Sequence, residues 1–248
     1  MRLGLISDLH GNPLALDAVL AELDRAGVDQ LVCLGDIAPG PHPVETVRRI
    51  REVGCPVVLG NWDAWLVDGV PPLPPPAGDK LGEQGEWWSA QLADDERDYL
   101  RSLPSAVEIA VGGATVLCVH GSPRANTEDI HATTPDETLA AMLDGHEPLV
   151  LATGHTHVEL VRIHGSTLIV NPGSVGLPFH TWPPANGEIR MSPWAECAIV
   201  KVEDGLVSTE LRRVPYDVQP LLDQAVEIGM PHARWWANCW LRLPADFR

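Results

Sequence analysis

The sequence predicts an α/β protein with mixed sheets, and two observations favour this class. Over residues 2–60, short apolar runs alternate with segments of helical periodicity, an order typical of parallel strands joined by right-handed crossovers. After residue 149 the apolar runs lie close together, with turns such as His164-Gly165 between them. This close spacing indicates hairpins and antiparallel pairing in the second half of the chain.

The expected strands are short runs of aliphatic and β-branched residues bounded by turn residues, as buried strands are. The first five cover Arg2–Ser7, Gln30–Gly35, Pro56–Gly60, Thr115–Val119 and Leu149–Thr153. Four further runs cover Glu159–Ile163, Thr167–Asn171, Ala195–Val202 and Leu206–Arg213.

Helices are expected between these strands. The first begins near a proline, repeats apolar residues every three or four positions and stops before Gly27; the second stops before Gly54 in the same way. The helical segments are Pro13–Ala26, Pro43–Val53, Lys80–Leu103 and Pro135–Leu143. Two proline-rich segments, Pro71–Pro76 and Phe179–Pro193, are predicted to be irregular, the first a stiff surface loop rather than a domain linker.

The length and the net charge of the chain limit the classes of function that it can have. We expect residues 1–248 to form a single domain, with 230–248 as a C-terminal extension packed on it or at an interface. The net charge of −17 opposes binding to nucleic acid and to anionic membranes. The five scattered cysteines suit a reducing compartment, and no leader or spanning segment is visible. We therefore expect a cytoplasmic protein, with a homo-oligomer left open.

Each of the first five expected strands is followed by a polar side chain that can bind a metal ion. These residues are Asp8, His10, Asp36, Asn61, His120, His155 and His157. In open α/β sheets the crevice outside the carboxyl ends of the strands is the binding site, so the seven side chains could converge there. Asp36 or Asn61 alone would be read as a turn residue. The recurrence at five strand ends favours a metal centre.

The chemistry of this ligand set indicates transition metals. Four imidazoles, two carboxylates and one amide suit Mn²⁺, Fe, Co²⁺, Ni²⁺ or Zn²⁺, and are too nitrogen-rich for Ca²⁺ or Mg²⁺. Seven ligands are too many for one ion that must also leave room for a substrate. We expect two divalent ions, about 3.5–4 Å apart, that share one carboxylate and clamp a phosphoryl group.

The ordered motifs resemble those of calcineurin-like metallophosphoesterases, in particular the small bacterial phosphodiesterase-type members. The motifs are Asp8-x-His10, Gly35-Asp36, Gly60-Asn61-x-Asp63, Val119-His120-Gly121, Gly154-His155-Thr156-His157 and Asn171-Pro172-Gly173-Ser174. The resemblance spans residues 1 to about 215. It implies a four-layer α/β/β/α sandwich with mixed sheets. It also implies one metal on Asp8, His10, Asp36 and His157, and the other on Asp36, Asn61, His120 and His155, with Asp36 as the bridge.

The function implied is hydrolysis of small-molecule phosphate esters, phosphodiesters favoured, by direct attack of metal-bound hydroxide. Asp36, Asn61 and His120 are then the expected catalytic residues. The alternatives are a phosphomonoesterase, or a hydrolase of nucleotides or dinucleoside polyphosphates. A different class is a catalytically weak scaffold that uses the same fold to bind protein partners. The absence of a basic stripe opposes a nuclease.

The third motif departs from the family pattern, because Trp62 stands where the family commonly has a histidine. That histidine is the usual candidate for stabilising the phosphoryl group or protonating the leaving oxygen, and an indole cannot act as a general acid. Arg124 is a candidate phosphate contact, or a surface charge. His180 and Arg190 are candidates for lining the site, or for an exposed loop. Together with Trp62, these three residues form the expected substrate-binding set.

Overall fold

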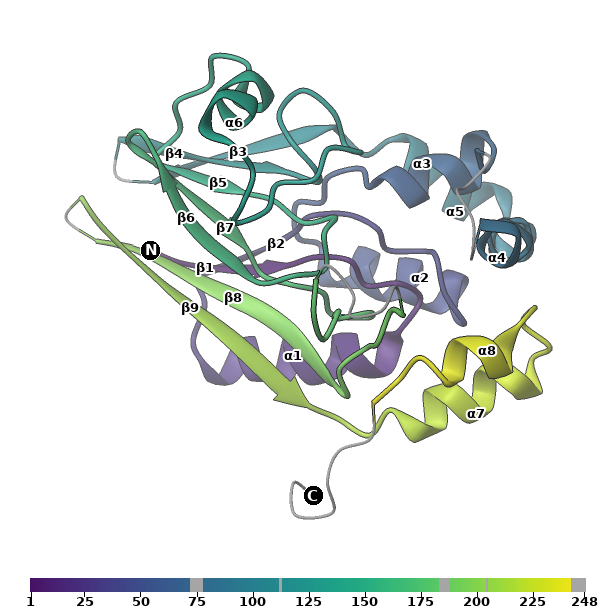
Figure 1. Ribbon diagram of the computed structural model, residues 1–248. Helices are drawn as coiled ribbons and strands as arrows, with labels where there is room; N and C mark the ends of the chain where they lie inside the picture. Colours follow the sequence, from purple (N-terminus) through teal and green to yellow (C-terminus); the bar gives the residue numbers. More distant parts are fainter. Residues whose placement is uncertain (72–77, 112, 183–187, 204, 242–248) are drawn as a thin grey trace.

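The computed structural model describes residues 1–71, 78–111, 113–182, 188–203 and 205–241. Two β-sheets stack face to face, and helices cover both outer faces (Figure 1). The order of layers is helices, first sheet, second sheet, helix, which confirms the predicted α/β/β/α sandwich with mixed sheets.

The first sheet has the strand order β2-β1-β8-β9. Its strands are β1 (Arg2–Ile6), β2 (Gln30–Cys33), β8 (Trp194–Glu203) and β9 (Leu206–Pro215). Strands β1 and β2 are parallel, and β8 and β9 are antiparallel to their neighbours. Alternate residues of β1 point to opposite faces: Leu3 and Leu5 enter the core between the sheets, and Ile6 enters the core under α1 (Pro13–Arg25) and α2 (Pro43–Val53).

The second sheet has the order β3-β4-β5-β7-β6. Its strands are β3 (Ala106–Val111), β4 (Ala114–Val119), β5 (Val150–Ala152), β6 (Leu160–His164) and β7 (Thr167–Asn171). The central strands β4, β5 and β7 are parallel, and the edge strands β3 and β6 are antiparallel. Leu139 and Leu143 of α6 (Asp136–Leu143) pack on the outer face of this sheet. Both sheets therefore contain parallel strands, and the expected metal ligands follow strands of both.

The remaining helices form two groups at the same end of the molecule (Figure 1). They are α3 (Asn61–Asp68), α4 (Gly78–Gln91), α5 (Asp94–Arg101), α7 (Gln219–Glu227) and α8 (Ala233–Ala237). The C-terminal part of the described chain adds Met230, Trp236 and Trp240 to the helix-side core. Leu241 N donates to Met191 O at 2.8 Å, which ties this part to the segment before β8. No described helix is long and apolar enough to cross a membrane.

Several sequence predictions of elements were wrong. The expected strand Pro56–Gly60 is only an isolated bridge between Val57 and Cys33, because Pro56 has no N–H to donate and α3 begins directly after Gly60. The expected helix over Lys80–Leu103 is interrupted at residues 92–93 and forms α4 and α5. Strand β3 and the helices α3, α7 and α8 were not predicted. Most of Pro71–Pro76, and residues 183–187 of the second irregular segment, lie outside the described residues.

Candidate metal centre

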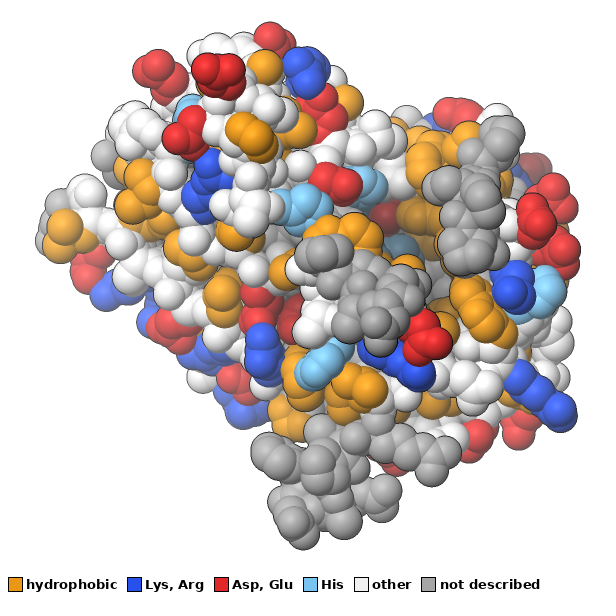
Figure 2. Space-filling view, viewed as in Figure 1, with side chains coloured by type: hydrophobic (Ala, Val, Ile, Leu, Met, Phe, Trp, Pro, Cys, Tyr) orange, Lys and Arg blue, Asp and Glu red, His pale blue; other side chains and the backbone are white. Residues whose placement is uncertain are grey.

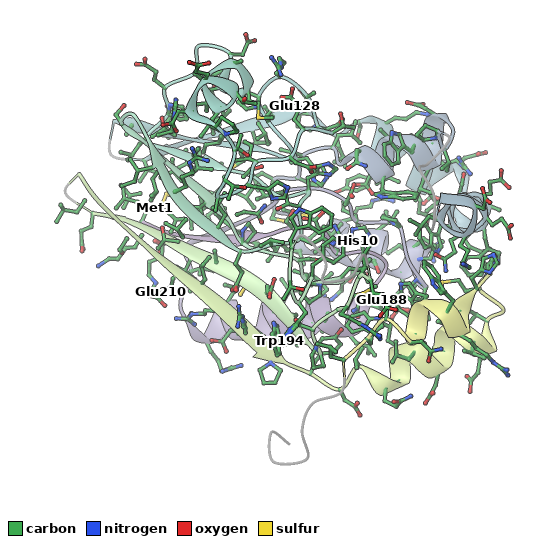
Figure 3. The ribbon with its side chains drawn as sticks, in the orientation of Figure 1. Met1, His10, Glu128, Glu188, Trp194 and Glu210 are labelled. Atoms are coloured by element: carbon green, nitrogen blue, oxygen red, sulfur yellow. The ribbon has the colours of Figure 1, made fainter. Side chains whose placement is uncertain are left out.

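The seven predicted ligands lie at one end of the sandwich, where strands of both sheets terminate. Asp8 and His10 follow β1, and Asp36 follows β2, in the first sheet. His120 follows β4 and the His155/His157 pair follows β5 in the second sheet, while Asn61 is the first residue of α3. Figure 3 labels His10 at this end and Met1 at the opposite end of the sheets.

The backbone at this end is strained in a way that the local hydrogen bonds maintain. Five ligand residues have a positive φ, which side-chain-bearing residues adopt rarely and at a cost: Asp8 (56°), His10 (46°), Asp36 (53°), His155 (67°) and His157 (57°). The loops after β1 and β2 brace each other, since Asp8 N donates to Gly35 O at 2.9 Å and His10 N to Asp36 O at 3.0 Å. Strain concentrated in this way is typical of functional sites.

Two motif glycines are required because side chains approach their backbone closely. A Cβ on Gly60 would collide with the carboxylate of Asp36, and a Cβ on Gly154 would collide with the hydroxyl of Ser7. The glycines before Asn61 and His155 therefore allow the ligand loops to pack against one another.

The first predicted ligand set is gathered tightly. Asp8, His10, Asp36 and His157 each place one ligand atom within 4.8 Å of all the others, and all four are buried. The Nε2 atoms of His10 and His157 are 3.0 Å apart. Two imidazole nitrogens that bind one ion at right angles are separated by about 3 Å, given metal–nitrogen distances of about 2.1 Å. The spacing therefore fits a single shared ion.

The hydrogen bonds around this set leave its ligand atoms free. His157 Nδ1 donates to Leu177 O at 2.8 Å, so in the neutral imidazole the Nε2 atom carries the lone pair. Asp8 Oδ2 accepts from Ser7 Oγ at 2.6 Å and from His155 N at 3.0 Å. Asp8 Oδ1 is buried without a hydrogen-bond partner in the described part of the chain. An orphaned carboxylate oxygen facing imidazole nitrogens fits a divalent cation.

The second predicted set includes one partly exposed side chain, His155, beside three buried ones. His120 Nε2 lies 2.9 Å from Asn61 Oδ1 and 3.6 Å from Asp36 Oδ2, and His120 Nδ1 donates to Leu34 O at 2.7 Å. The His155 ring lies edge-on to His120, with 5.1 Å between centroids. Asp36 Oδ2 is also 3.7 Å from His10 Nε2, so this carboxylate lies between the two sets.

Electrostatics at the centre favour a cation. Burial opposes ionisation of Asp8, but the nearby imidazoles, His157 foremost, hold its pKa well below the usual value. Burial also opposes the charged form of His120, but Asp36 and Asp8 raise its pKa to about 9. Burial lowers the pKa of His10 and of His155, which favours neutral imidazoles. The negative charge of these buried carboxylates, which stabilises the proton on His120, also favours a bound metal ion.

The structure turns the four predicted substrate-binding side chains toward other partners. Arg124 forms an ion pair with Glu128. Arg190 donates to Glu188 and to Asn238 O, both at 2.9 Å. The exposed His180 lies near Ser192 Oγ, and the Trp62 indole packs against Trp65 and Trp88, with centroids 5.0 and 5.5 Å away.

Two residues at the site, Asp129 and Asp63, were missed by sequence reasoning as functional candidates. Asp129 Oδ1 lies 3.3 Å from His155 Nε2, and the Phe179 ring packs on His157 with 4.5 Å between centroids. Asp63 accepts hydrogen bonds from Ile37 N and Ala38 N at 2.9–3.1 Å and so shapes the loop after Asp36. Only Asp63 had a sequence signal, its place in the third motif. Figure 2 shows histidines gathered around an acidic side chain near the middle of the visible face.

A buried cluster of carboxylates and imidazoles at the strand ends of a two-sheet sandwich defines the class of metal-binding α/β proteins. The comparison with protein families is specific: the model of the calcineurin-like phosphoesterase superfamily domain matches residues 1–191. The chain therefore belongs to this family of phosphoester hydrolases, which typically bind divalent metals.

Solved structures and a curated relative agree with this assignment. A metallophosphoesterase from Sphaerobacter thermophilus is 30% identical and superposes with a TM-score of 0.70, over 94% of this chain and 96% of its own. The hypothetical protein PH1004 from Pyrococcus horikoshii is 25% identical, with a TM-score of 0.75 over 93% of this chain and 94% of its own. The phosphodiesterase YfcE from Escherichia coli is 27% identical over 189 residues, which cover 72% of this chain and 81% of that protein.

Proposed function

We propose that the protein hydrolyses small-molecule phosphodiesters by direct attack of water at a dinuclear metal centre. The observation that carries this proposal is the buried cluster in which four ligand atoms lie within 4.8 Å of one another, next to the second set around His120. When bound, two divalent ions would polarise the phosphoryl oxygens and lower the pKa of a shared water.

The position of Asp36 supports its role as the shared ligand. Its Oδ2 atom is 3.7 Å from His10 Nε2 on one side and 3.6 Å from His120 Nε2 on the other. Its Oδ1 atom accepts a hydrogen bond of 2.8 Å from Trp62 N, which fixes the rotation of the carboxylate. A carboxylate held between two imidazoles in this way can orient both ions toward one phosphoryl group.

Two features support diesters over monoesters. The Trp62 indole is packed among helices α3 and α4, so position 62 supplies no proton donor for a poor leaving group. The carboxylate of Asp129 lies beside His155 and is 54% exposed, so it opposes a dianionic monoester more than a monoanionic diester. The Escherichia coli relative, named a phosphodiesterase, supports the same ester class.

The scaffold alternative fits the site less well. A metal-free scaffold would have no use for five expected ligand residues held in left-handed conformations, or for a buried carboxylate oxygen that has no hydrogen-bond partner among the described residues. The phosphomonoesterase and polyphosphate hydrolase alternatives would use the same metal chemistry as a phosphodiesterase. Substrate preference distinguishes them from it.

The metal content of purified protein tests the proposal. Under saturating Mn²⁺, elemental analysis should find close to two ions per chain, since two ions are needed to use the whole ligand set. Asp36→Asn should weaken both sites by about tenfold or more, because the carboxylate is shared. Asp98→Asn, at a side chain 78% exposed, is the matched control and should bind metal normally. At most one ion in the wild-type protein would contradict the dinuclear centre.

Substrate preference tests the ester class. The Mn²⁺-loaded protein should hydrolyse bis(p-nitrophenyl) phosphate with a kcat/KM about tenfold or more above that for p-nitrophenyl phosphate. Both substrates release p-nitrophenolate, so a difference in kcat/KM arises from the charge of the ester and from its second arm. A preference for the monoester would favour the phosphomonoesterase alternative.

A further inference from the structure

We propose that three aromatic rings beside the metal centre bind a planar, uncharged ring carried by the non-leaving arm of the diester, as in a nucleoside. The rings belong to Phe179, Trp182 and His131, and we call them the aromatic row. This inference rests on the proposed phosphodiesterase function and specifies its substrate class.

The aromatic row starts at a metal ligand and leads away from it. Phe179 packs on His157 with 4.5 Å between centroids and 32° between planes. Trp182 stacks on Phe179 at 5.6 Å and 17°, and His131 stacks on Trp182 at 5.9 Å and 20°. Nearly parallel rings at these distances are displaced sideways, so each leaves part of its face uncovered. Trp182 is 42% exposed, which leaves a large apolar surface open to a ligand.

Hydrogen bonds hold the aromatic row in place before any ligand arrives. Trp182 Nε1 donates to His131 Nε2 at 3.1 Å. Arg162 of β6 donates to His131 O at 3.0 Å and to Thr134 O at 2.6 Å, and so fixes the loop that carries His131. Phe179 N donates to His157 O at 3.2 Å. A preformed surface loses little conformational entropy on binding.

The charges around the aromatic row favour an uncharged ring over a second phosphate. The carboxylate of Asp129 lies 3.9 Å from His131 Nε2 and is 54% exposed. In the part of the chain that the structure describes, the nearby candidates for phosphate contacts are already paired, Arg124 with Glu128 and Arg190 with Glu188. Figure 3 labels Glu128 above His10 and Glu188 below it. A polyphosphate chain would therefore meet a carboxylate without a free cation to offset it.

Two substrates with one leaving group test this inference on the Mn²⁺-loaded full-length protein. They are thymidine 5′-(p-nitrophenyl phosphate) and methyl p-nitrophenyl phosphate, which differ only in the arm that stays on phosphorus. Stacking of one base contributes about a tenfold effect or more, so the wild-type protein should favour the thymidine ester by about that factor in kcat/KM. Trp182→Ala should bring the ratio close to one by raising KM for the thymidine ester alone.

Two further variants separate stacking from general damage. Trp182→Phe keeps an aromatic face but loses the hydrogen bond to His131, and it should retain most of the preference. Ile189→Ala, at an exposed apolar side chain in the same segment, should leave the ratio unchanged.

Binding of product analogues tests the aromatic row without requiring that the protein hydrolyse phosphodiesters. Calorimetry should show thymidine 5′-monophosphate binding the metal-loaded protein about tenfold more tightly than methyl phosphate, and Trp182→Ala should remove that difference. If neither ester is hydrolysed but this difference is seen, the aromatic row stands and the proposed function fails. Equal affinities and equal kcat/KM values for the two arms would overturn the aromatic row and leave the phosphodiesterase proposal intact.

Discussion

The backbone of Trp62 contacts the candidate metal centre, but its side chain packs away from it. Its backbone N–H donates to Asp36 Oδ1 at 2.8 Å, but its indole packs edge-on against Trp65 and Trp88. A histidine at this position would have a smaller side chain with a titratable nitrogen, which the indole lacks.

We expect rates to depend steeply on leaving-group pKa, because position 62 provides no general acid. Trp62→His should flatten this dependence by accelerating the poorest leaving groups most, by about tenfold or more. The measurement is kcat/KM for a series of substituted phenyl methyl phosphates. Trp62→Phe, which supplies no acid, is the control and should keep the steep slope. A flat dependence in the wild-type protein would mean that another residue donates the proton.

Glu196 makes stability depend on pH. It is buried beside Trp194 and Ser174, and burial, followed by the charge of Glu159, raises its pKa to about 7. The folded state therefore binds a proton more tightly than the unfolded chain does. The resulting stabilisation, about 3 kcal/mol at most, is complete below pH 4.5 and is lost as pH rises toward 7.

Glu196→Gln should remove most of this pH dependence, because the amide stays uncharged. Urea unfolding should show the variant to be more stable than the wild-type protein at pH 8 by up to about 3 kcal/mol, with no gain at pH 4.5. Glu52→Gln, at a side chain 71% exposed, should follow the wild-type curve. Parallel curves for Glu196→Gln and wild type would contradict the assignment.

That the expected ligands lie close together could be predicted from the sequence, and most of the residues around them could not. Asp8, Asp36 and His120 directly follow apolar strands, and this local pattern is visible in the chain itself. Asp129 reaches the site only through the packing of a loop that is distant in sequence from His155. No local pattern marks such residues, since their role depends on tertiary contacts.

At the scale of elements, helix α1 depends on its N-cap residue, Asn12. Asn12 Oδ1 accepts from Ala15 N at 3.0 Å, and Asn12 Nδ2 donates to the Tyr216 hydroxyl at 2.9 Å. Asn12→Ala should lower the free energy of unfolding by about 1–2 kcal/mol, measured by urea denaturation. Asn12→Asp retains the capping oxygen and should recover part of the loss. An unchanged stability in Asn12→Ala would show that the cap contributes nothing.

Elements with strong periodicity and clear ends were predicted well. Helix α2 matches its predicted bounds, Pro43–Val53, because a proline starts it and Gly54, in the left-handed conformation, ends it. Strand β3 was missed because it is an edge strand in which exposed residues, Glu108 among them, alternate with half-buried or buried ones, so it has no continuous apolar run. The segment Pro56–Gly60 reads as a strand, but its pairing is limited by a proline at one end and a helix at the other.

At the scale of the whole molecule, the candidate metal centre draws its residues from both sheets. Asp8, His10 and Asp36 extend from the first sheet, and His157 extends from the second. A bound ion should therefore resist separation of the layers. At a free metal concentration of about 100 times Kd, one ion adds about 2.7 kcal/mol to the free energy of unfolding.

Thermal unfolding with saturating Mn²⁺ and with a chelator measures this effect. Removal of metal should lower the melting temperature by about 5–10 °C, given the usual dependence for a chain of this size. In His157→Ala the difference should shrink, because the second sheet then loses its ligand to the first ion. Identical melting temperatures with and without metal would show that the centre does not link the layers.

The left-handed backbone at five ligand positions constrains how this sequence can change over time. Each such residue lowers the free energy of unfolding by about 1–3 kcal/mol relative to a residue that adopts a positive φ without strain. Glycine or asparagine would relieve this strain. A mutation from aspartate or histidine to glycine there would thus trade activity for stability. A gene copy freed from selection for hydrolysis should lose these ligands first, and the resulting protein should be harder to unfold.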